Sequence, residues 1–107
     1  MGNGGAGPAV VKVWIFQKGN GQLRVDPSPF VVRQGDSLQF INLTGTPAEA
    51  RFEREQYEGA APVVIKPGRN DPSVRIVANP GTYIEYDVTI GNTYADGGSK
   101  PGGIVDP

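Results

Sequence analysis

Glycine and proline interrupt this sequence so often that long helices have little room in it. The chain has 16 Gly and 10 Pro among 107 residues, close to a quarter of its length, and both residue types break regular helices. A helical bundle is therefore disfavoured. The length is that of about one domain, and we expect residues 10–107 to form it. Residues 1–9 are rich in Gly and favour a flexible N-terminal arm or a cloning remnant.

The segments between these breakers alternate in the manner of short β-strands. In the clearest segment, residues 82–90, we expect the even-numbered side chains to face the core and the odd-numbered ones to face solvent. Strand patterns also occur at residues 10–16, 23–25, 30–32, 37–43, 63–65 and 74–77. Residues 48–57 predict a strand that runs into a helical turn. Seven or eight short strands predict an all-β fold, an antiparallel Greek-key β-sandwich.

The first strand pattern is apolar on both of its faces. Val13 and Ile15 lie on one face, while Trp14 and Phe16 lie on the other. This predicts a strand that is covered on both sides, or one whose second face meets the N-terminal arm or a partner. We expect Trp14 to be a core residue, as we expect for Tyr86.

Composition excludes several classes of function. The chain has no Cys and no His, so it lacks thiolate nucleophiles, imidazole bases and the usual ligands of zinc and copper. Its formal net charge of -1 gives no basic excess for binding nucleic acid. No apolar run has the length of a membrane-spanning helix, and the first residues do not resemble a signal peptide. We therefore expect no cofactor, no membrane insertion and no enzymatic activity.

Three stretches resemble the cupredoxin family, the small blue-copper β-sandwiches. They are PSPFVVRQGDSLQFIN at residues 27–42, TPAEARF at residues 46–52 and NPGTYIEYDVTI at residues 79–90. The order of the expected strands is similar to that of the family as well. The resemblance implies a cupredoxin-like sandwich and a periplasmic or extracellular location.

The residues that bind copper in that family are missing here. The family uses two His, one Cys and usually a weak axial Met. By the resemblance, Ala48 falls at the first His position, and the Cys position falls on Asp87 or, after a shift of one residue, on Val88. The loop at residues 91–103 offers no soft donor. The resemblance thus implies the fold without the metal and without electron transfer.

A fold retained without its metal predicts a binding or structural module. We expect contact through an edge strand or through the loops at the end that holds copper in the family. The partner would be another protein or other domains of a longer parent chain, and a homo-oligomer formed through edge strands is an alternative. The candidate contact residues are Thr46, Pro47, Ala48, Tyr57, Asn92, Tyr94 and Asp96.

Two other functions remain open from the sequence. Tyr57 and Tyr94 would suit a small-ligand or carbohydrate site, because exposed aromatic rings stack on apolar ring surfaces. A calcium site would need several oxygen ligands to converge, and the candidates for it are Asp71, Asp87, Asp96 and Asp106 or loop carbonyls near Asn92. Separately, Asn42-Leu43-Thr44 matches the acceptor triplet for N-glycosylation.

Overall fold

The structure, a computed structural model, describes residues 8–68, 73–98 and 100–107. Its regular elements are β-strands and two short 3₁₀ turns, so the expected all-β class is confirmed. The described elements are β2 (Val10–Gln17), β3 (Leu23–Asp26), β4 (Phe30–Val32), β5 (Ser37–Asn42), β6 (Ala48–Arg51), η1 (Arg54–Gln56), β7 (Tyr57–Glu58), β8 (Val63–Ile65), β9 (Ser73–Ile76), β10 (Tyr83–Glu85), β11 (Asp87–Ile90), β12 (Thr93–Tyr94), η2 (Ala95–Gly98) and β13 (Gly102–Val105).

The predicted number of strands was too low. The described residues contain twelve strands rather than seven or eight. One expected strand is divided at Tyr86 into β10 and β11, and short strands such as β7 and β12 form inside segments that read as loops. Residues 48–57 do contain a strand followed by a helical turn, as predicted.

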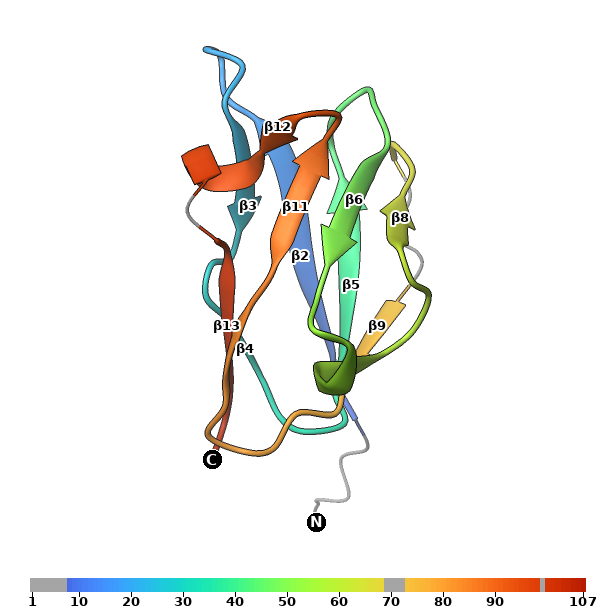
Figure 1. Ribbon diagram of the computed structural model, residues 1–107, viewed down its shortest axis with the longest axis vertical. Helices are drawn as coiled ribbons and strands as arrows, with labels where there is room; N and C mark the ends of the chain where they lie inside the picture. Colours follow the sequence, from blue (N-terminus) through green and yellow to red (C-terminus); the bar gives the residue numbers. More distant parts are fainter. Residues whose placement is uncertain (1–7, 69–72, 99) are drawn as a thin grey trace.

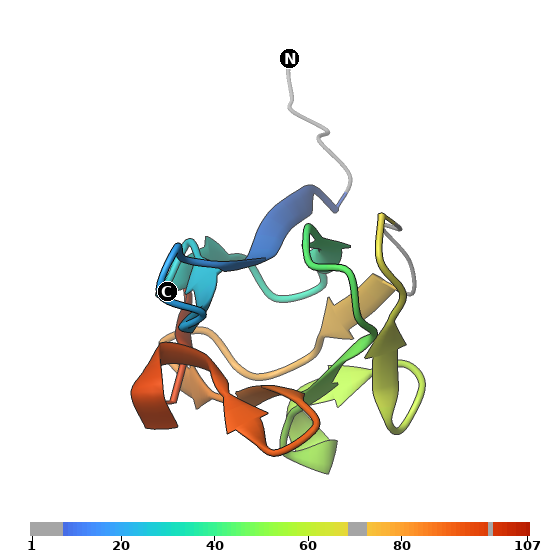
Figure 2. The same cartoon turned by 90° about the horizontal axis from the view of Figure 1, so that it is seen from above.

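The strands form three sheets around one core (Figures 1 and 2). The five-stranded sheet has the order β3-β2-β5-β9-β7, the four-stranded sheet β12-β11-β6-β8 and the three-stranded sheet β10-β13-β4. Because β10 and β11 are successive parts of one run, they join the three-stranded and four-stranded sheets. These two sheets therefore present neighbouring outer faces.

The expectation of purely antiparallel pairing was wrong. β2 pairs with β5 in parallel, with Val13 opposite Phe40, and β13 pairs with β4 in parallel, with Ile104 opposite Val31. Side-chain alternation reports which face of a strand is buried, and it carries no information on strand direction. The chain leaves the five-stranded sheet at β4 and returns at β5, so that β5 runs alongside β2 in the same direction.

Alternation did predict the core. Ile84, Tyr86 and Val88, which the alternation at residues 82–90 directs inward, are all buried, and so is Phe40 in β5. Tyr86 is the centre of an aromatic cluster and stacks on Phe52 with 4.6 Å between ring centroids. Phe40 meets the same Tyr86 ring edge-on at 6.1 Å. Such aromatic pairs contribute beyond the area that they bury, so the joint between the two smaller sheets is firmly packed.

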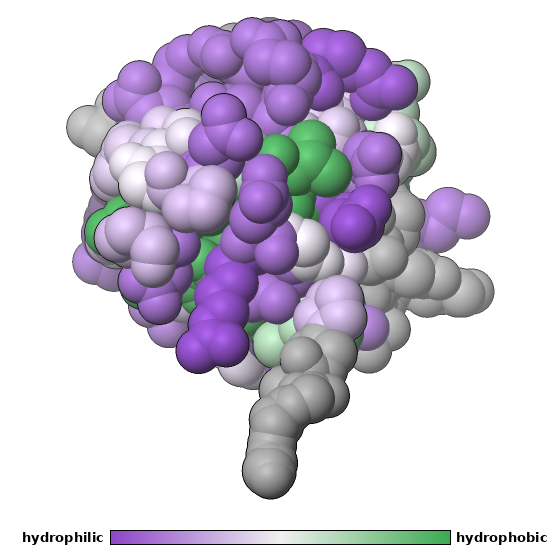
Figure 3. Space-filling view, turned by 90° about the horizontal axis from the view of Figure 1, so that it is seen from below, coloured by the Kyte–Doolittle hydropathy of each residue, from purple (hydrophilic) through white to green (hydrophobic). Residues whose placement is uncertain are grey.

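The expected burial of Trp14 is wrong. Only Val13 and Ile15 of β2 are fully buried, and Trp14 on the opposite face is 37% exposed. Among the described residues, one sheet face of β2 is covered and the other faces outward. The start of β2 and the C-terminal residue lie at the same end of the molecule (Figure 1). Seen from that end, the described surface is mainly hydrophilic, and hydrophobic residues appear there in small separate areas (Figure 3).

Candidate functional site

A buried asparagine organises the loop between β5 and β6. Asn42 is fully buried, and its Nδ2 donates to the carbonyl oxygens of Thr46 at 2.8 Å and of Ile65 at 2.9 Å. Its Oδ1 accepts from the backbone N–H and the hydroxyl of Thr44. The side chain therefore holds the start of β6 beside the end of β8. Because this amide is enclosed and fully hydrogen-bonded, the folded chain does not present Asn42 for glycosylation.

The loop held by Asn42 borders a shallow hollow on the outer face of the four-stranded sheet. The hollow has a volume of about 220 Å³ and is lined by Pro47, Ala48, Glu49, Arg51, Val64, Thr89 and Gly91. Strand register places four residues of this sheet in one line across its strands, and one of them, Thr89, is only 8% exposed. Tyr94 lies opposite Thr89, Thr89 opposite Glu49, and Glu49 opposite Val64. Paired residues point to the same face, and we call these four residues the mixed row.

An ion pair between two residues of β6 lines the hollow. The Arg51 Nε lies 2.7 Å from the Glu49 Oε2. The hydrogen bond to Glu49 and the charge of that carboxylate raise the pKa of Arg51, and Tyr94 and Asp87 contribute smaller effects of the same sign. Asp87 lies opposite Arg51 in the strand register. The pair supplies hydrogen-bond donors and acceptors without a net charge.

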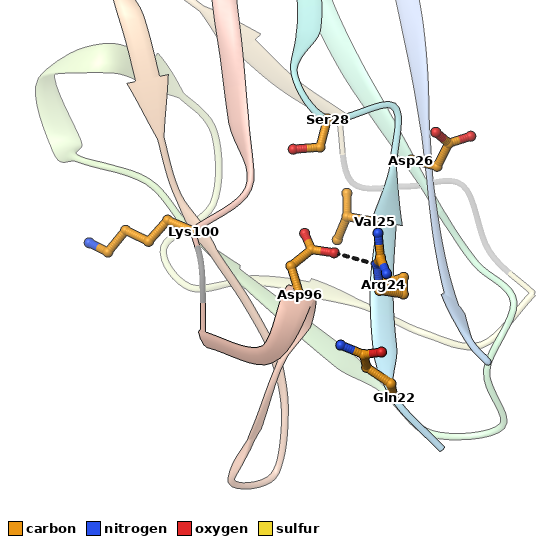
Figure 4. Close-up of a pocket in the computed structure, with 7 residues that line it drawn as sticks. All are labelled: Gln22, Arg24, Val25, Asp26, Ser28, Asp96 and Lys100. Atoms are coloured by element: carbon orange, nitrogen blue, oxygen red, sulfur yellow. Dashed lines mark ion pairs between the residues drawn. The ribbon is translucent and has the colours of Figure 1, made fainter. Parts of the chain in front are cut away.

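A second pocket lies between β3 and η2 (Figure 4). It has a volume of about 350 Å³ and is lined by Gln22, Arg24, Val25, Asp26, Ser28, Asp96 and Lys100. The Arg24 Nε and the Asp96 Oδ1 lie 2.7 Å apart and close one side of it. The Ser28 Oγ accepts a hydrogen bond from the backbone N–H of Gly102 at 3.1 Å. The Lys100 side chain extends away from the Arg24–Asp96 pair (Figure 4), with its Nζ 4.0 Å from the Asp87 Oδ2. The lining is thus polar and balanced in charge.

The outer face of the three-stranded sheet has a different character. Tyr83 lies opposite Ile104, and Ile104 lies opposite Val31. Their exposed fractions are 55% for Tyr83, 37% for Ile104 and 59% for Val31. We call these three residues the apolar row. Tyr83 also covers Gly102, because a Cβ added at Gly102 would lie 2.1 Å from the Tyr83 hydroxyl oxygen.

The seven predicted contact residues do not form one site. Thr46 and Pro47 lie on the exposed loop beside the hollow, and Asn92 is exposed in the turn between β11 and β12. Ala48 is buried in β6. Tyr94 is 50% exposed at the end of the mixed row. Asp96 instead lines the β3–η2 pocket.

Tyr57 is not the surface residue that we expected. It lies in β7, where it is buried, and its ring packs against Phe52 with 5.4 Å between centroids. Its hydroxyl donates to the Ala60 carbonyl oxygen at 3.1 Å. The segment has strong turn signals on both sides, but pairing with β9 turns this ring inward. A site that uses Tyr57 together with Tyr94 is therefore ruled out by burial.

The described carboxylates do not converge as a calcium site requires. Within residues 8–68, 73–98 and 100–107, no three Asp or Glu side chains gather where they could hold a metal ion. Asp96 pairs with Arg24, and Asp87 lies near Lys100, while Asp71 lies outside the described residues. At the positions that resemble the copper ligands, Ala48 and Val88 are buried aliphatic residues that have no ligand atom in their side chains.

No protein-family profile matches this chain, and no curated protein shows significant similarity to it. Within the described residues, no helix is long and apolar enough to span a membrane.

Most residues of both outer faces were not predicted from the sequence. The candidate contact residues did not include Glu49, Arg51, Thr89, Val31 or Ile104. Alternation does place Thr89 on the wet side of its strand and leaves Val31 outward between Phe30 and Val32. The missing information was the pairing register, which decides which outward residues become neighbours.

Proposed function

We propose that this chain is a metal-free, cupredoxin-like Greek-key β-sandwich that acts as a binding module for another protein, or for another domain of a longer parent chain. The observation that carries this proposal is the apolar row. Three large hydrophobic side chains from three neighbouring strands are exposed side by side. Contiguous exposed apolar surface marks interaction sites, whereas single exposed hydrophobic residues are normal.

The edge strands on either side of the apolar row are also able to bind a protein partner. β10 and β4 are the edge strands of the three-stranded sheet, and edge strands can pair with another chain. A partner that covers the apolar row would bury aromatic and aliphatic side chains together, as in the cores of protein interfaces. The same residues in a second copy would give a homo-oligomer. A periplasmic or extracellular location follows from the cupredoxin resemblance and belongs to this proposal.

Site-specific crosslinking tests the proposal. A photoreactive amino acid replaces Val31 in the cell that produces the protein, and the same replacement at Val64, which is 42% exposed on the four-stranded sheet, is the control. We expect a discrete crosslinked product from position 31 only, and mass spectrometry of that product distinguishes a second copy from a different protein. Ile104→Lys should abolish the product, and Tyr94→Ala should leave it intact. Equal products at both positions, or none at position 31, would contradict the proposal.

A further inference from the structure

We infer that the outer face of the four-stranded sheet binds a short, neutral oligosaccharide along the mixed row. This inference is independent of the protein contact proposed above, because it concerns a different face and different residues. The first support is the order of side chains in the row. Tyr94 and Val64, both well exposed, form its two ends, and between them the half-buried Glu49 and the buried Thr89 line the hollow.

This order matches the surface of a sugar. A pyranose ring has an apolar C–H face, which packs on an aromatic or aliphatic side chain, and a rim of hydroxyl groups that donate and accept hydrogen bonds. The row crosses four strands, so its ends are separated by roughly 14 Å, or three strand spacings. That length suits a disaccharide or trisaccharide lying across the strands, with the hollow of about 220 Å³ beneath it.

The polar groups of the hollow favour a neutral ligand. The Glu49 carboxylate is an acceptor and the Arg51 guanidinium is a donor of several hydrogen bonds. Because the two groups are 2.7 Å apart, each compensates the charge of the other. Asp87 and Lys100 form a looser pair nearby at 4.0 Å. A charged ligand would have to compete with one of these pairs, whereas hydroxyl groups can join them.

A sugar site of this kind combines an exposed aromatic ring with paired hydrogen-bond donors and acceptors. The β3–η2 pocket and the apolar row each lack one of these two features. The β3–η2 pocket is polar, and no aromatic side chain lines it. The apolar row has an aromatic side chain, but its two neighbours are aliphatic. Of these three surfaces on the described part of the chain, the mixed row alone combines an exposed ring with paired donors and acceptors.

Backbone amide NMR tests the inference on the whole chain. The probes are neutral disaccharides and trisaccharides of glucose, xylose, mannose and galactose, with α and with β linkages. Each probe is added up to about 10 mM, which would nearly saturate a site with a Kd of about 1 mM. We expect saturable shifts for at least one probe, centred on Glu49, Thr89 and Tyr94. Tyr94→Ala should weaken binding at least about tenfold, which corresponds to 1.4 kcal/mol.

Tyr83→Ala is the matched control, because it removes the other tyrosine that is exposed on a sheet face. It should leave the sugar affinity unchanged. An amide spectrum that keeps its dispersion shows that each variant is folded. The inference is overturned if no neutral probe produces saturable shifts, if the two variants lose affinity equally, or if uronic-acid oligosaccharides bind more tightly than neutral ones. None of these results depends on the crosslinking at Val31, so the two proposals can fail separately.

Discussion

The three-stranded and four-stranded sheets share one strand run and one core, yet their outer faces differ. Each face presents one exposed tyrosine, Tyr83 on the first and Tyr94 on the second. Tyr83 lies over Gly102 and beside Ile104, on a surface without polar neighbours in its row. Tyr94 lies beside Thr89, in the row that contains Glu49, the ion-pair partner of Arg51. The same residue type therefore contributes to two different kinds of surface.

This difference shows that the neighbours across the strands, more than the tyrosine itself, determine what such a face can bind. Cross-strand neighbours lie about 5 Å apart, so a ligand that touches a tyrosine also touches the residues paired with it. Aliphatic neighbours favour a dry protein contact, and paired charges favour hydroxyl groups. Single substitutions can destabilise the residues beneath one face and leave the other face intact. We expect the largest loss of stability from substitution of Asn42.

Asn42→Ala should destabilise the four-stranded sheet, because Asn42 holds the start of β6 beside the end of β8. The substitution leaves the Thr46 and Ile65 carbonyl oxygens and the Thr44 N–H without their present partner. Each buried group left unpaired costs about 1–3 kcal/mol, so we expect a loss of about 3 kcal/mol in the free energy of unfolding, measured by urea titration. Asn92→Ala, at an exposed turn position, is the control and should change stability by less than about 0.5 kcal/mol.

If the comparison of faces is correct, Asn42→Ala should also disturb the hollow more than the apolar row. At urea concentrations where the variant remains folded, amide shifts should change most in β6 and β8 and least in β10 and β13. A change that is largest in the three-stranded sheet would contradict the role given to Asn42.

Gly103→Ala should destabilise the three-stranded sheet by about 2–3 kcal/mol, because added volume in a packed core forces neighbours to shift. A Cβ at position 103 would lie 2.1–2.4 Å from three atoms of the Phe30 ring, which is buried. Gly102→Ala is the neighbouring control. Its Cβ would meet the end of the exposed Tyr83 side chain, which can rotate away. We expect thermal unfolding to show a large loss for the first variant and a small one for the second, and equal losses would mean that the Tyr83 ring is held rigidly.

Tyr86→Phe should have the smallest effect at neutral pH, a gain of about 1 kcal/mol, because it removes a buried polar group without a partner. The Tyr86 hydroxyl has no hydrogen-bond partner in the described part of the chain. Tyr57→Phe is the matched control, since the Tyr57 hydroxyl does donate to Ala60. It should lower stability by about 1 kcal/mol. Chemical denaturation of both variants measures the difference, and changes of the same sign would contradict this assignment.

The same hydroxyl predicts a dependence on alkaline pH. Burial, with Asp96 as a further cause, raises the pKa of Tyr86 far above its ordinary value near 10. Below pH 10 the phenol is protonated in the folded and the unfolded chain, so its effect on stability is constant. Above pH 10 the unfolded chain releases the proton and the folded chain retains it, so stability falls by about 1.4 kcal/mol per pH unit. Tyr86→Phe should remove this part of the slope.

Much of the fold was predictable from residue patterns, and the sites were much less so. The alternation at residues 82–90 predicted the burial of Ile84, Tyr86 and Val88 correctly, because alternation follows directly from strand geometry. It did not predict that Thr89 is buried too. Trp14 was misplaced because an apolar residue on a strand can face outward when no layer covers it.

The candidate sites depend on register and on strand direction, which local patterns do not encode. Tyr94 was predicted as an exposed contact residue and is exposed. Glu49 is far away in the sequence and joins the same row, on the other side of Thr89, only through the shared pairing of β6 and β12 with β11. The prediction that Tyr57 is an exposed contact residue was wrong for the same reason, since the pairing of β7 with β9 placed its ring in the core.

The uninterrupted passage of the chain from β10 through Tyr86 into β11 has a mechanical consequence. A protein held on the apolar row and a sugar held on the mixed row would be attached to two parts of one backbone segment whose centre is clamped by aromatic packing. Tension between the two ligands would be carried along that segment by covalent bonds, without first pulling one sheet away from another. The molecule would then serve as a short, stiff tether.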